Sequence, residues 1–219
     1  MKILITRFRE KGVGEYLYNE LTKQGHEVDV LLGNINEPAT YEGLDLTSYD
    51  RVVNVAGVTL NQPVTQMEYE DSSKVISVNL LGAMMLTSEY AKQRIEDGAI
   101  FHISSIGSRK VMTNCSVYSA TKAGLSHYIS CAGWELRNNK IAVVGFNPAN
   151  ILNTSLTLDV QKGMRENRGM SQEQIDTIYK DALDPEVLAK YMVRTITATT
   201  PEVMMVSGES LFLTNSDHR

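Results

Sequence analysis

Short apolar runs alternate with longer helical patterns along this chain, and that alternation constrains the fold more than any other feature. The runs are too short for buried helices and are bounded by glycine, proline and small polar residues. Strands that alternate with helices form a parallel sheet with helices on both of its faces. The sequence therefore predicts the α/β class, with a doubly wound parallel sheet. We expect strands over residues 2–6, 27–32, 51–55, 99–104, 141–146 and 203–206.

The intervening segments carry helical patterns, expected over residues 13–24, 71–94, 117–136 and 185–196. Gly25 should end the first helix, and Asp184 followed by Pro185 suits the start of the last one. The helix over 71–94 has apolar residues on more than one side. One side should face the sheet, and the other could face a partner subunit. The alternative is a helix buried deeply within one domain.

Length and composition predict a single domain over residues 1–219. The hydrophobic content of 42% and the charged content of 21% are ordinary for a soluble globular protein. Residues 153–183 are polar, contain methionine and are weakly periodic, so we expect a mobile substrate lid there. The tail after Asn215 should be frayed.

Charge and cysteine usage exclude several classes of partner. The net charge is −5, and no basic stripe is interleaved with aromatic residues, which argues against nucleic acid. Two cysteines, Cys115 and Cys131, are too few for a disulfide framework. The apolar opening run is too short for a signal sequence, and no stretch reaches the roughly 18 apolar residues of a membrane span. We expect a cytoplasmic protein without a metal site.

Four polar residues carry the most informative pattern for function. Tyr118 and Lys122 are four residues apart and share one face of a predicted helix. Ser105 lies at the end of an apolar run, and Asn79 lies within an apolar helix, where a buried amide needs partners. A free phenol has a pKa near about 10, and a nearby ammonium should lower it. Such a phenol can protonate a carbonyl oxygen while a hydroxyl stabilises the developing charge.

Each of these residues also has a structural interpretation. A helical tyrosine such as Tyr118 is usually a packing residue, and a lysine such as Lys122 is usually solvated. Ser105 could be an ordinary strand end. Their joint spacing favours function, because an acid beside its charge partner near a strand end is typical of an active site.

With the Asn-Val-Ala-Gly motif at 54–57 and the Asn-Leu-Leu-Gly motif at 79–82, these residues resemble the short-chain dehydrogenase/reductase family. The resemblance extends from Lys2 to about Asn153. It implies a Rossmann-like fold and a nicotinamide cofactor. It also implies that Asn79 holds a water in a proton relay, and that Lys122 additionally binds the nicotinamide ribose.

The spacing also discriminates within the family. Enoyl reductases use a longer interval between the tyrosine and the lysine, so reduction of a carbon–carbon double bond is disfavoured. Sugar epimerases and dehydratases share the shorter interval but need a larger C-terminal substrate domain. Residues 149–219 leave little room for one.

The phosphate-binding loop departs from the family pattern Thr-Gly-x-x-x-Gly-x-Gly. Gly12 and Gly14 match, but Arg7 replaces the first glycine and the loop is one residue longer. Arginine cannot freely adopt a positive φ, so this turn must differ, and it binds the cofactor either in a modified way or weakly. Arg9 and Lys11 add donors suited to phosphate, which favours modified binding. The alternative is a solvated charged loop.

The cofactor type is predicted from the end of the second strand. NAD-preferring relatives carry an aspartate there for the ribose 2′-hydroxyl, and the matching position is Leu32. Because no carboxylate is there to repel a 2′-phosphate, we expect NADP rather than NAD. In the family's count of strands, Asp45 falls at the third strand and Arg51 begins the fourth. Only five residues separate them, so the crossover helix between these two strands should be missing.

The resemblance also implies a set of cofactor contacts. Leu46, with Asp45, falls at the third strand and should touch adenine, and the backbone of Ile151 should hold the nicotinamide amide. The hydroxyl position of the family falls at Asn153, or at Thr154 after a one-residue shift. The full set is Thr6, Arg7, Arg9, Lys11, Gly12, Val13, Gly14, Asp45, Leu46, Asn54, Ala56, Gly57, Tyr118, Lys122, Pro148, Ile151 and Asn153.

The sequence therefore predicts NADPH-dependent reduction of a ketone or aldehyde, or the reverse alcohol oxidation, with Tyr118 as general acid/base. The alternative is a catalytically silent NADP-binding sensor or scaffold, which the altered loop at Arg7 motivates. We expect a homodimer or homotetramer through the helices over 71–94 and 117–136. The substrate stays open. Met112, Asn150, Leu156 and residues 164–170 could line the pocket or lid, or could simply close the core.

Overall fold

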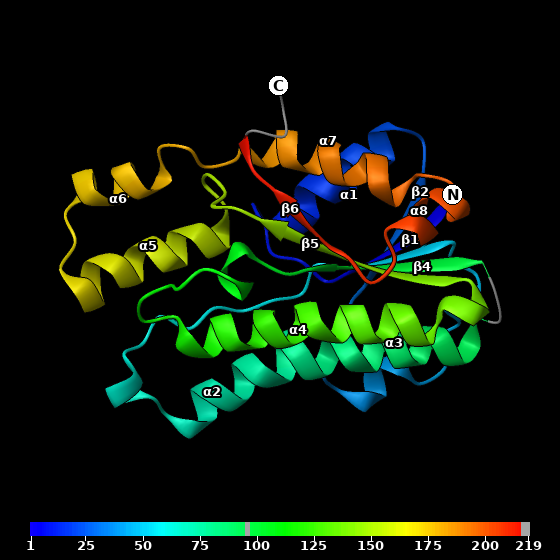
Figure 1. The fold of residues 1–219 in the computed structure, drawn as a ribbon, viewed down its shortest axis with the longest axis horizontal. Helices are drawn as coiled ribbons and strands as arrows, with labels where there is room; N and C mark the ends of the chain where they lie inside the picture. The colour runs from blue at the N-terminus through cyan, green and yellow to red at the C-terminus, as the bar shows by residue number, and fades with distance from the viewer. Residues whose placement is uncertain (95–96, 216–219) are drawn as a thin grey trace.

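The computed structural model describes residues 1–94 and 97–215, with a parallel sheet at its centre (Figure 1). Within these residues, six strands are arranged in the order β2-β1-β3-β4-β5-β6. Every neighbouring pair is parallel, so the predicted α/β, Rossmann-like doubly wound fold is confirmed. The strands are β1 (Lys2–Thr6), β2 (Glu27–Leu31), β3 (Arg51–Asn54), β4 (Gly98–Ile103), β5 (Ile141–Pro148) and β6 (Ser210–Leu213).

Helices cover both faces of the sheet (Figure 1). Side chains of β1 alternate between the two faces, with Ile3 and Ile5 in one apolar core and Leu4 in the other. Strands buried on both faces are apolar throughout, which explains the continuous runs in the sequence. The first core is covered by α1 (Val13–Lys23), α7 (Pro185–Ile196) and α8 (Thr200–Met205), and the second by α3 (Gly82–Gln93) and α4 (Ser116–Glu135).

The predicted helix over 71–94 changes its winding in the middle. It begins as α2 (Tyr69–Ile76), passes through a π-helical turn at Ser77–Leu81 and continues as α3. Such π turns disturb the regular backbone ladder and occur frequently at functional sites. This one contains Asn79, whose side chain is buried.

The connection from β2 to β3 is short, as expected. It contains only a 3-10 turn at Pro38–Tyr41, so the missing crossover helix is confirmed. The strand expected at Asp45 and Leu46 is wrong. Asp45 accepts hydrogen bonds from the backbone N (2.9 Å) and the hydroxyl (2.6 Å) of Thr47, and these bonds stabilise a turn. Leu46 is buried in the second core.

The strand expected over 203–206 is also wrong. These residues belong largely to α8, which begins with a capping box between Thr199 and Glu202 and has Pro201 in its first turn. The strand follows later, as β6, which pairs with β5. A four-residue apolar run cannot distinguish a strand from a turn of buried helix, and the cap decides the outcome here.

Residues 153–183, predicted as a lid, form two helices at one end of the molecule (Figure 1). They are α5 (Ser155–Arg168) and α6 (Gln172–Tyr179), and Gly169 ends α5 with a φ of 60°. The two helices share a small apolar cluster that includes Val160 and Ile175. Residues 216–219, predicted to be frayed, lie outside the described residues.

A chain of buried polar side chains crosses the sheet beneath its carboxyl edge. The Thr6 hydroxyl donates to Asn54 Oδ1 (3.3 Å), and Asn54 Nδ2 lies 3.1 Å from His102 Nδ1. His102 Nε2 lies 2.9 Å from the Thr87 hydroxyl. The chain therefore joins β1, β3, β4 and α3. Burial lowers the pKa of His102 to about 3, so its imidazole is neutral in the folded protein.

This histidine should make stability dependent on pH. In the unfolded chain His102 binds a proton below about pH 6.5, whereas in the folded protein it stays neutral to about pH 3. The contribution of His102 to the free energy of unfolding is therefore complete above pH 6.5. It is lost as the pH falls, by about 2 kcal/mol between pH 7 and pH 5. The free energy of unfolding, measured with urea, should show this slope with pH in wild-type protein and in the control His127→Gln, whose histidine is exposed. An equally steep slope in His102→Gln would contradict this assignment.

Candidate active site

A cavity of about 440 Å³ opens at the carboxyl edge of the sheet. The strand order reverses at β1, which has β2 on one side and β3 on the other. Open parallel sheets bind their ligands outside the strand ends at this kind of switch point. The walls come from the loops that follow β1, β2 and β3, from the end of β4, and from α4, α5 and α6.

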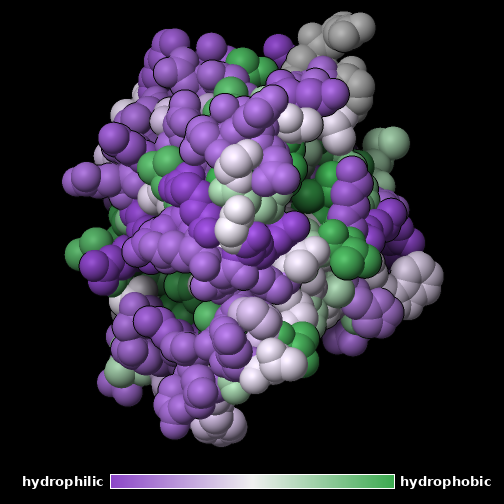
Figure 2. All heavy atoms as spheres, turned by 90° about the vertical axis from the view of Figure 1, so that its left-hand side faces the viewer, coloured by the Kyte–Doolittle hydropathy of each residue, from purple (hydrophilic) through white to green (hydrophobic). Residues whose placement is uncertain are grey.

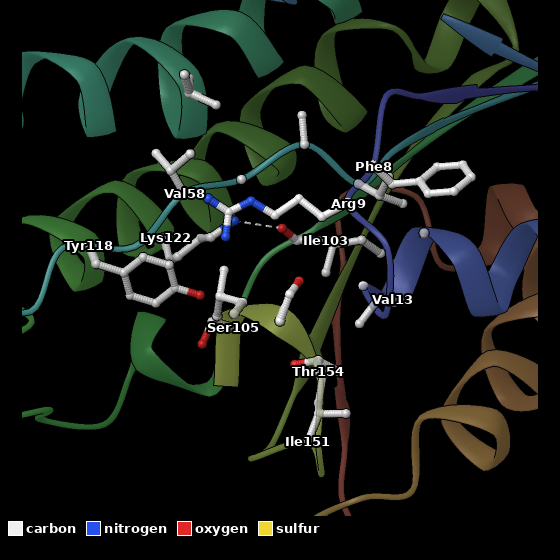
Figure 3. Close-up of a pocket in the computed structure, with 18 of the residues that line it drawn as sticks. Phe8, Arg9, Val13, Val58, Ile103, Ser105, Tyr118, Lys122, Ile151 and Thr154 are labelled. Carbon is white, nitrogen blue, oxygen red and sulfur yellow. Dashed lines mark hydrogen bonds between the residues drawn. The ribbon is translucent and has the colours of Figure 1, made fainter. Parts of the chain in front are cut away.

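Three of the four predicted catalytic residues meet in this cavity (Figure 3). Ser105 follows β4, and Tyr118 and Lys122 lie in the first two turns of α4. The Tyr118 phenol lies near enough to the Ser105 hydroxyl for that hydroxyl to affect its pKa. The Lys122 ammonium donates to the Ile103 carbonyl (2.8 Å) and lies 5.7 Å from the centre of the Tyr118 ring. The three functional groups are thus held beside one another by two elements of the core.

Burial dominates the electrostatics of this group. It raises the pKa of Tyr118 above its ordinary value, and the nearby Ser105 hydroxyl acts in the opposite direction. Burial also lowers the pKa of Lys122 to about 8. We expected the ammonium of Lys122 to lower the pKa of Tyr118, but removal of the phenol from water is the largest effect and raises that pKa instead. Tyr118 is therefore a neutral phenol at pH 7, able to donate a proton.

Asn79 does not line the cavity. Its side chain is 1% exposed; its Oδ1 accepts from the Val58 backbone N (2.8 Å), and its Nδ2 donates to the Val58 carbonyl (2.9 Å) and to the Thr121 hydroxyl (3.2 Å). Thr121 lies on α4, between Tyr118 and Lys122. Asn79 therefore ties the loop after β3 to the helix that carries the phenol. Its predicted role in a proton relay stays a prediction.

The loop after β1 differs from the family's turn at Arg7, as expected. The Arg7 backbone N donates to the Leu31 carbonyl (2.9 Å), so this residue continues the pairing of β1 with β2. The positive φ occurs at Lys11 instead, at 55°. The Gly12 N–H then closes the turn on the Arg9 carbonyl (3.0 Å) and leads into α1. The longer loop thus relocates the turn by several residues.

Gly14 is required by close packing against this loop. A Cβ atom added to it would lie 2.4 Å from the Phe8 Cβ and 2.8 Å from a Val55 methyl group. The missing side chain lets α1 start close to the ends of β1 and β3, where the cavity lies. A loop with this close approach, a helix N-terminus and two arginines fits the phosphates of a dinucleotide.

The structure sorts the predicted cofactor residues into three groups. Those that line the cavity are Arg7, Arg9, Gly12, Val13, Gly14, Ala56, Gly57, Tyr118, Lys122, Pro148 and Ile151. Thr6 and Asn54 lie beneath it, where the Thr6 hydroxyl accepts from the backbone N atoms of Val55 (3.0 Å) and Ala56 (3.1 Å) and shapes the loop after β3. The residues outside the lining are Lys11, Asp45, Leu46 and Asn153.

Asn153 is exposed, with a φ of 51°, while its neighbour Thr154 lines the cavity. The Thr154 hydroxyl accepts from the Thr157 backbone N (3.2 Å) and caps α5. The one-residue shift considered above therefore describes this structure better. Met112, Asn150 and Leu156, candidates for the pocket, line it as well.

Sequence reasoning missed one wall of the cavity. The loop after β2 supplies this wall, at the side where a strand containing Asp45 and Leu46 was expected. Polar residues directly after a strand were the available signal, but they carried no family motif. The wall residues are Gly33, Asn34, Ile35 and Asn36, with Lys74 and Val78 opposite them on the π-interrupted helix.

The described part of the chain bears on three further expectations. No group of three or more His, Cys, Asp or Glu residues there could hold a metal ion. Among the helices described, none has the length and apolar character needed to cross a membrane. Cys115 and Cys131 are both free.

Several proteins of known sequence are similar to this chain. A family model described as short chain dehydrogenase matches residues 15–165, more than half of the chain. Ketoacyl reductase HetN of Nostoc is 27% identical over 158 residues, which cover 71% of this chain and 51% of that protein. Human L-xylulose reductase is 33% identical over 106 residues, which cover 47% of this chain and 43% of that protein. The chain thus spans about half the length of these curated relatives.

Solved structures share the fold. A variant of actinorhodin polyketide ketoreductase with NADPH has a TM-score of 0.84 at 21% identity, over 98% of this chain and 96% of that one. Sorbitol-6-phosphate 2-dehydrogenase SrlD from Erwinia amylovora has a TM-score of 0.82 at 19% identity, over 98% of each chain. At such identities the likeness shows the fold, and the family follows from the family model. The chain belongs to the short-chain dehydrogenases, a family of oxidoreductases that bind a nicotinamide cofactor.

Proposed function

We propose that this protein uses NADPH to reduce a ketone or an aldehyde, or catalyses the reverse oxidation of an alcohol, with Tyr118 as general acid/base. The observation that carries the proposal is the meeting of Ser105, Tyr118 and Lys122 in one buried cavity at the switch point of the sheet. The similarity to a ketoacyl reductase and to an L-xylulose reductase supports carbonyl chemistry. The substrates of those proteins are theirs, and the substrate of this chain stays open.

A bound nicotinamide supplies the hydride chemistry. In the direction of reduction, the neutral Tyr118 phenol would donate its proton to the substrate oxygen. The Ser105 hydroxyl already accepts from the Gly107 backbone N (3.0 Å), so its own proton is available to donate to that oxygen. The phenolate left on Tyr118 would be stabilised by the nearby Lys122 ammonium. In oxidation, the same residues act in the opposite order.

Replacement of Tyr118 by phenylalanine should remove the proton donor and leave the cavity intact. We expect Tyr118→Phe to lower kcat for a carbonyl substrate by about 100-fold or more, since general acid catalysis contributes roughly 10²–10⁴-fold. The matched control is Tyr128→Phe, which changes another tyrosine of the same helix, outside the cavity lining. Steady-state kinetics and NADPH fluorescence titration separate turnover from binding. Equal turnover by wild-type and Tyr118→Phe protein would refute the assigned mechanism.

The sensor or scaffold alternative has its own outcome in the same measurements. Tight NADPH binding by wild-type protein, without turnover of any compound in a broad carbonyl panel, would favour a sensor. The intact set of Ser105, Tyr118 and Lys122 argues against that alternative, because a sensor needs no proton donor in its cavity.

The preference for NADP is part of the proposal. Arg7 lines the cavity next to the end of β2, and the position of the family's aspartate is occupied by Leu32, which is exposed. The nearest carboxylate on that loop, Glu37, accepts from Asn34 Nδ2 (2.7 Å) and does not line the cavity. A 2′-phosphate would thus meet a cation and no lining carboxylate.

A carboxylate introduced at the end of β2 should reverse this preference. We expect Leu32→Asp to weaken NADPH binding by about tenfold, or roughly 1.4 kcal/mol, through repulsion of the 2′-phosphate. NADH binding should be unchanged or tighter, because the carboxylate can accept from the 2′-hydroxyl. The uncharged variant Leu32→Asn serves as the control. Tighter binding of NADH than of NADPH by wild-type protein would overturn the NADP assignment.

The lid is also a proposal. Leu156 and Val160 of α5 and Tyr179 of α6 line the cavity, so these helices would contact a substrate. Figure 2 shows their end of the molecule as mainly hydrophilic, with apolar side chains in small separate groups. The apolar lining therefore lies inside the cavity, where it would exclude water from the Tyr118 phenol.

The cytoplasmic location predicted from sequence stays a prediction.

Self-association through the helices over 71–94 and 117–136 completes the proposal. Ile76 and Leu81 are each 47% exposed, and Trp134 on α4 is 74% exposed. Covering such side chains with a second copy of the chain would remove apolar surface from water. We expect size-exclusion chromatography with light scattering to give two or four times the 24.4 kDa mass of the chain. A mass of one chain throughout the micromolar range would contradict this.

A further inference from the structure

Arg9 lines the cavity and pairs with a carboxylate that lies outside it. Its Nη1 is 2.7 Å from Asp159 Oδ2 on α5, and the two residues are 150 positions apart in the sequence. In Figure 3 the Arg9 side chain extends from the loop beside Val13 across the cavity toward Val58. Asp159 lines a separate polar pocket outside the cavity, together with residues 59–61. The Arg9 guanidinium therefore lies between the cavity and the neighbouring polar pocket.

Two backbone contacts set the position of this bridge. The Gly12 N–H bonds to the Arg9 carbonyl (3.0 Å) and holds Arg9 in the turn before α1. The Ser155 backbone N donates to the Lys11 carbonyl (3.2 Å), so the first residue of α5 is attached to the same loop. The loop and α5 are thus joined by a backbone hydrogen bond and by an ion pair, of which only the ion pair depends on side-chain charge.

The ion pair itself is weak. The Arg9 side chain is 61% exposed and the Asp159 side chain 50%. Pairs this exposed to water change an equilibrium by about fivefold or less. A guanidinium makes stronger, two-pronged hydrogen bonds to a phosphate group. A phosphate that enters the cavity can therefore take Arg9 away from Asp159.

Arg9 differs in this respect from two other cations of the lining. Arg7 and Lys74 also line the cavity, and within residues 1–94 and 97–215 neither side chain makes an ion pair. They can meet an anion without giving up a partner. Arg9 has to exchange one anion for another, so its contribution to binding is reduced by the strength of its bond to Asp159.

We propose that Asp159 is a built-in competitor for the phosphates of the dinucleotide. Arg9 pairs with Asp159 in the ligand-free protein and transfers to the pyrophosphate when the cofactor enters. The transfer releases α5 from the ion pair, so cofactor entry loosens one of the two links between the phosphate loop and the lid helices. This inference rests on the proposed function, because its ligand is the dinucleotide.

The test is a thermodynamic cycle of NADPH binding, measured by fluorescence titration without any substrate. Asp159→Asn should tighten binding by about two- to fivefold, because the competing anion is gone. Arg9→Gln should weaken binding by roughly tenfold, the loss of one charge-assisted contact. In the Arg9→Gln background, Asp159→Asn should change nothing. Glu166→Gln is the matched control, since Glu166 lies on the same helix and pairs with Lys162 (3.8 Å) rather than with Arg9; binding should match wild type.

Other outcomes overturn the exchange. Equal tightening by Asp159→Asn with and without Arg9 would mean that the carboxylate acts only through its general charge. Weaker binding by Asp159→Asn would mean that the ion pair closes over the bound cofactor. NADPH binding that is the same in wild-type and Asp159→Asn protein would remove this inference alone. If wild-type protein binds neither NADPH nor NADH at millimolar concentration, the proposed function is wrong as well.

Discussion

The parallel pairing of β1 with both β2 and β3 is the constraint on which the rest of this structure depends. Parallel strands buried on both faces place all their carboxyl ends at one edge, and the reversal of strand order at β1 leaves a crevice there. Segments that are far apart in the sequence, such as the loop before α1 and the start of α5, are brought to that edge. The polar chain from Thr6 through Asn54 and His102 to Thr87 then fixes the strand ends with hydrogen bonds inside an apolar core.

Burial of the side chains at this edge shifts their pKa values more than any single neighbouring charge does. Tyr118 and Lys122 are both removed from water, which favours the neutral form of each. The sequence suggested that the ammonium would control the phenol, because the two residues share a helix face. In the folded protein the ammonium bonds to the Ile103 carbonyl. In the proposed reaction, the neutral phenol of Tyr118 would donate the proton and the nearby cation would stabilise the phenolate that remains.

The shortened connection from β2 to β3 shows how a fold can lose an element and keep its cavity. Because the strand expected at Asp45 and Leu46 is absent, Asp45 forms an exposed turn and Leu46 fills the second core. The loop that begins at Gly33 lines the cavity at that side instead. The turn at Arg7 was expected to differ from the family's, and it does: Arg7 extends the sheet, and Lys11 takes the positive φ. In both places a nearby loop residue or segment compensates for a local change in the sequence.

Local patterns were sufficient for much of the molecule. The strand over 141–146 and the helix over 185–196 were predictable because burial on two faces and a clear cap leave marks within a few residues. The spacing of Ser105, Tyr118 and Lys122 likewise predicted their meeting, since a strand end and the first turns of the next helix are neighbours in any βα unit. The strand expected over 203–206 was wrong because a short apolar run suits either state. By itself, the sequence determined the α/β class, most of the strands and helices, and the meeting of Ser105, Tyr118 and Lys122 in one site. Only the tertiary structure decided the direction of the pKa shifts, the choice of Thr154 over Asn153, and the pairing of Arg9 with Asp159, because each depends on burial or on a contact between distant segments.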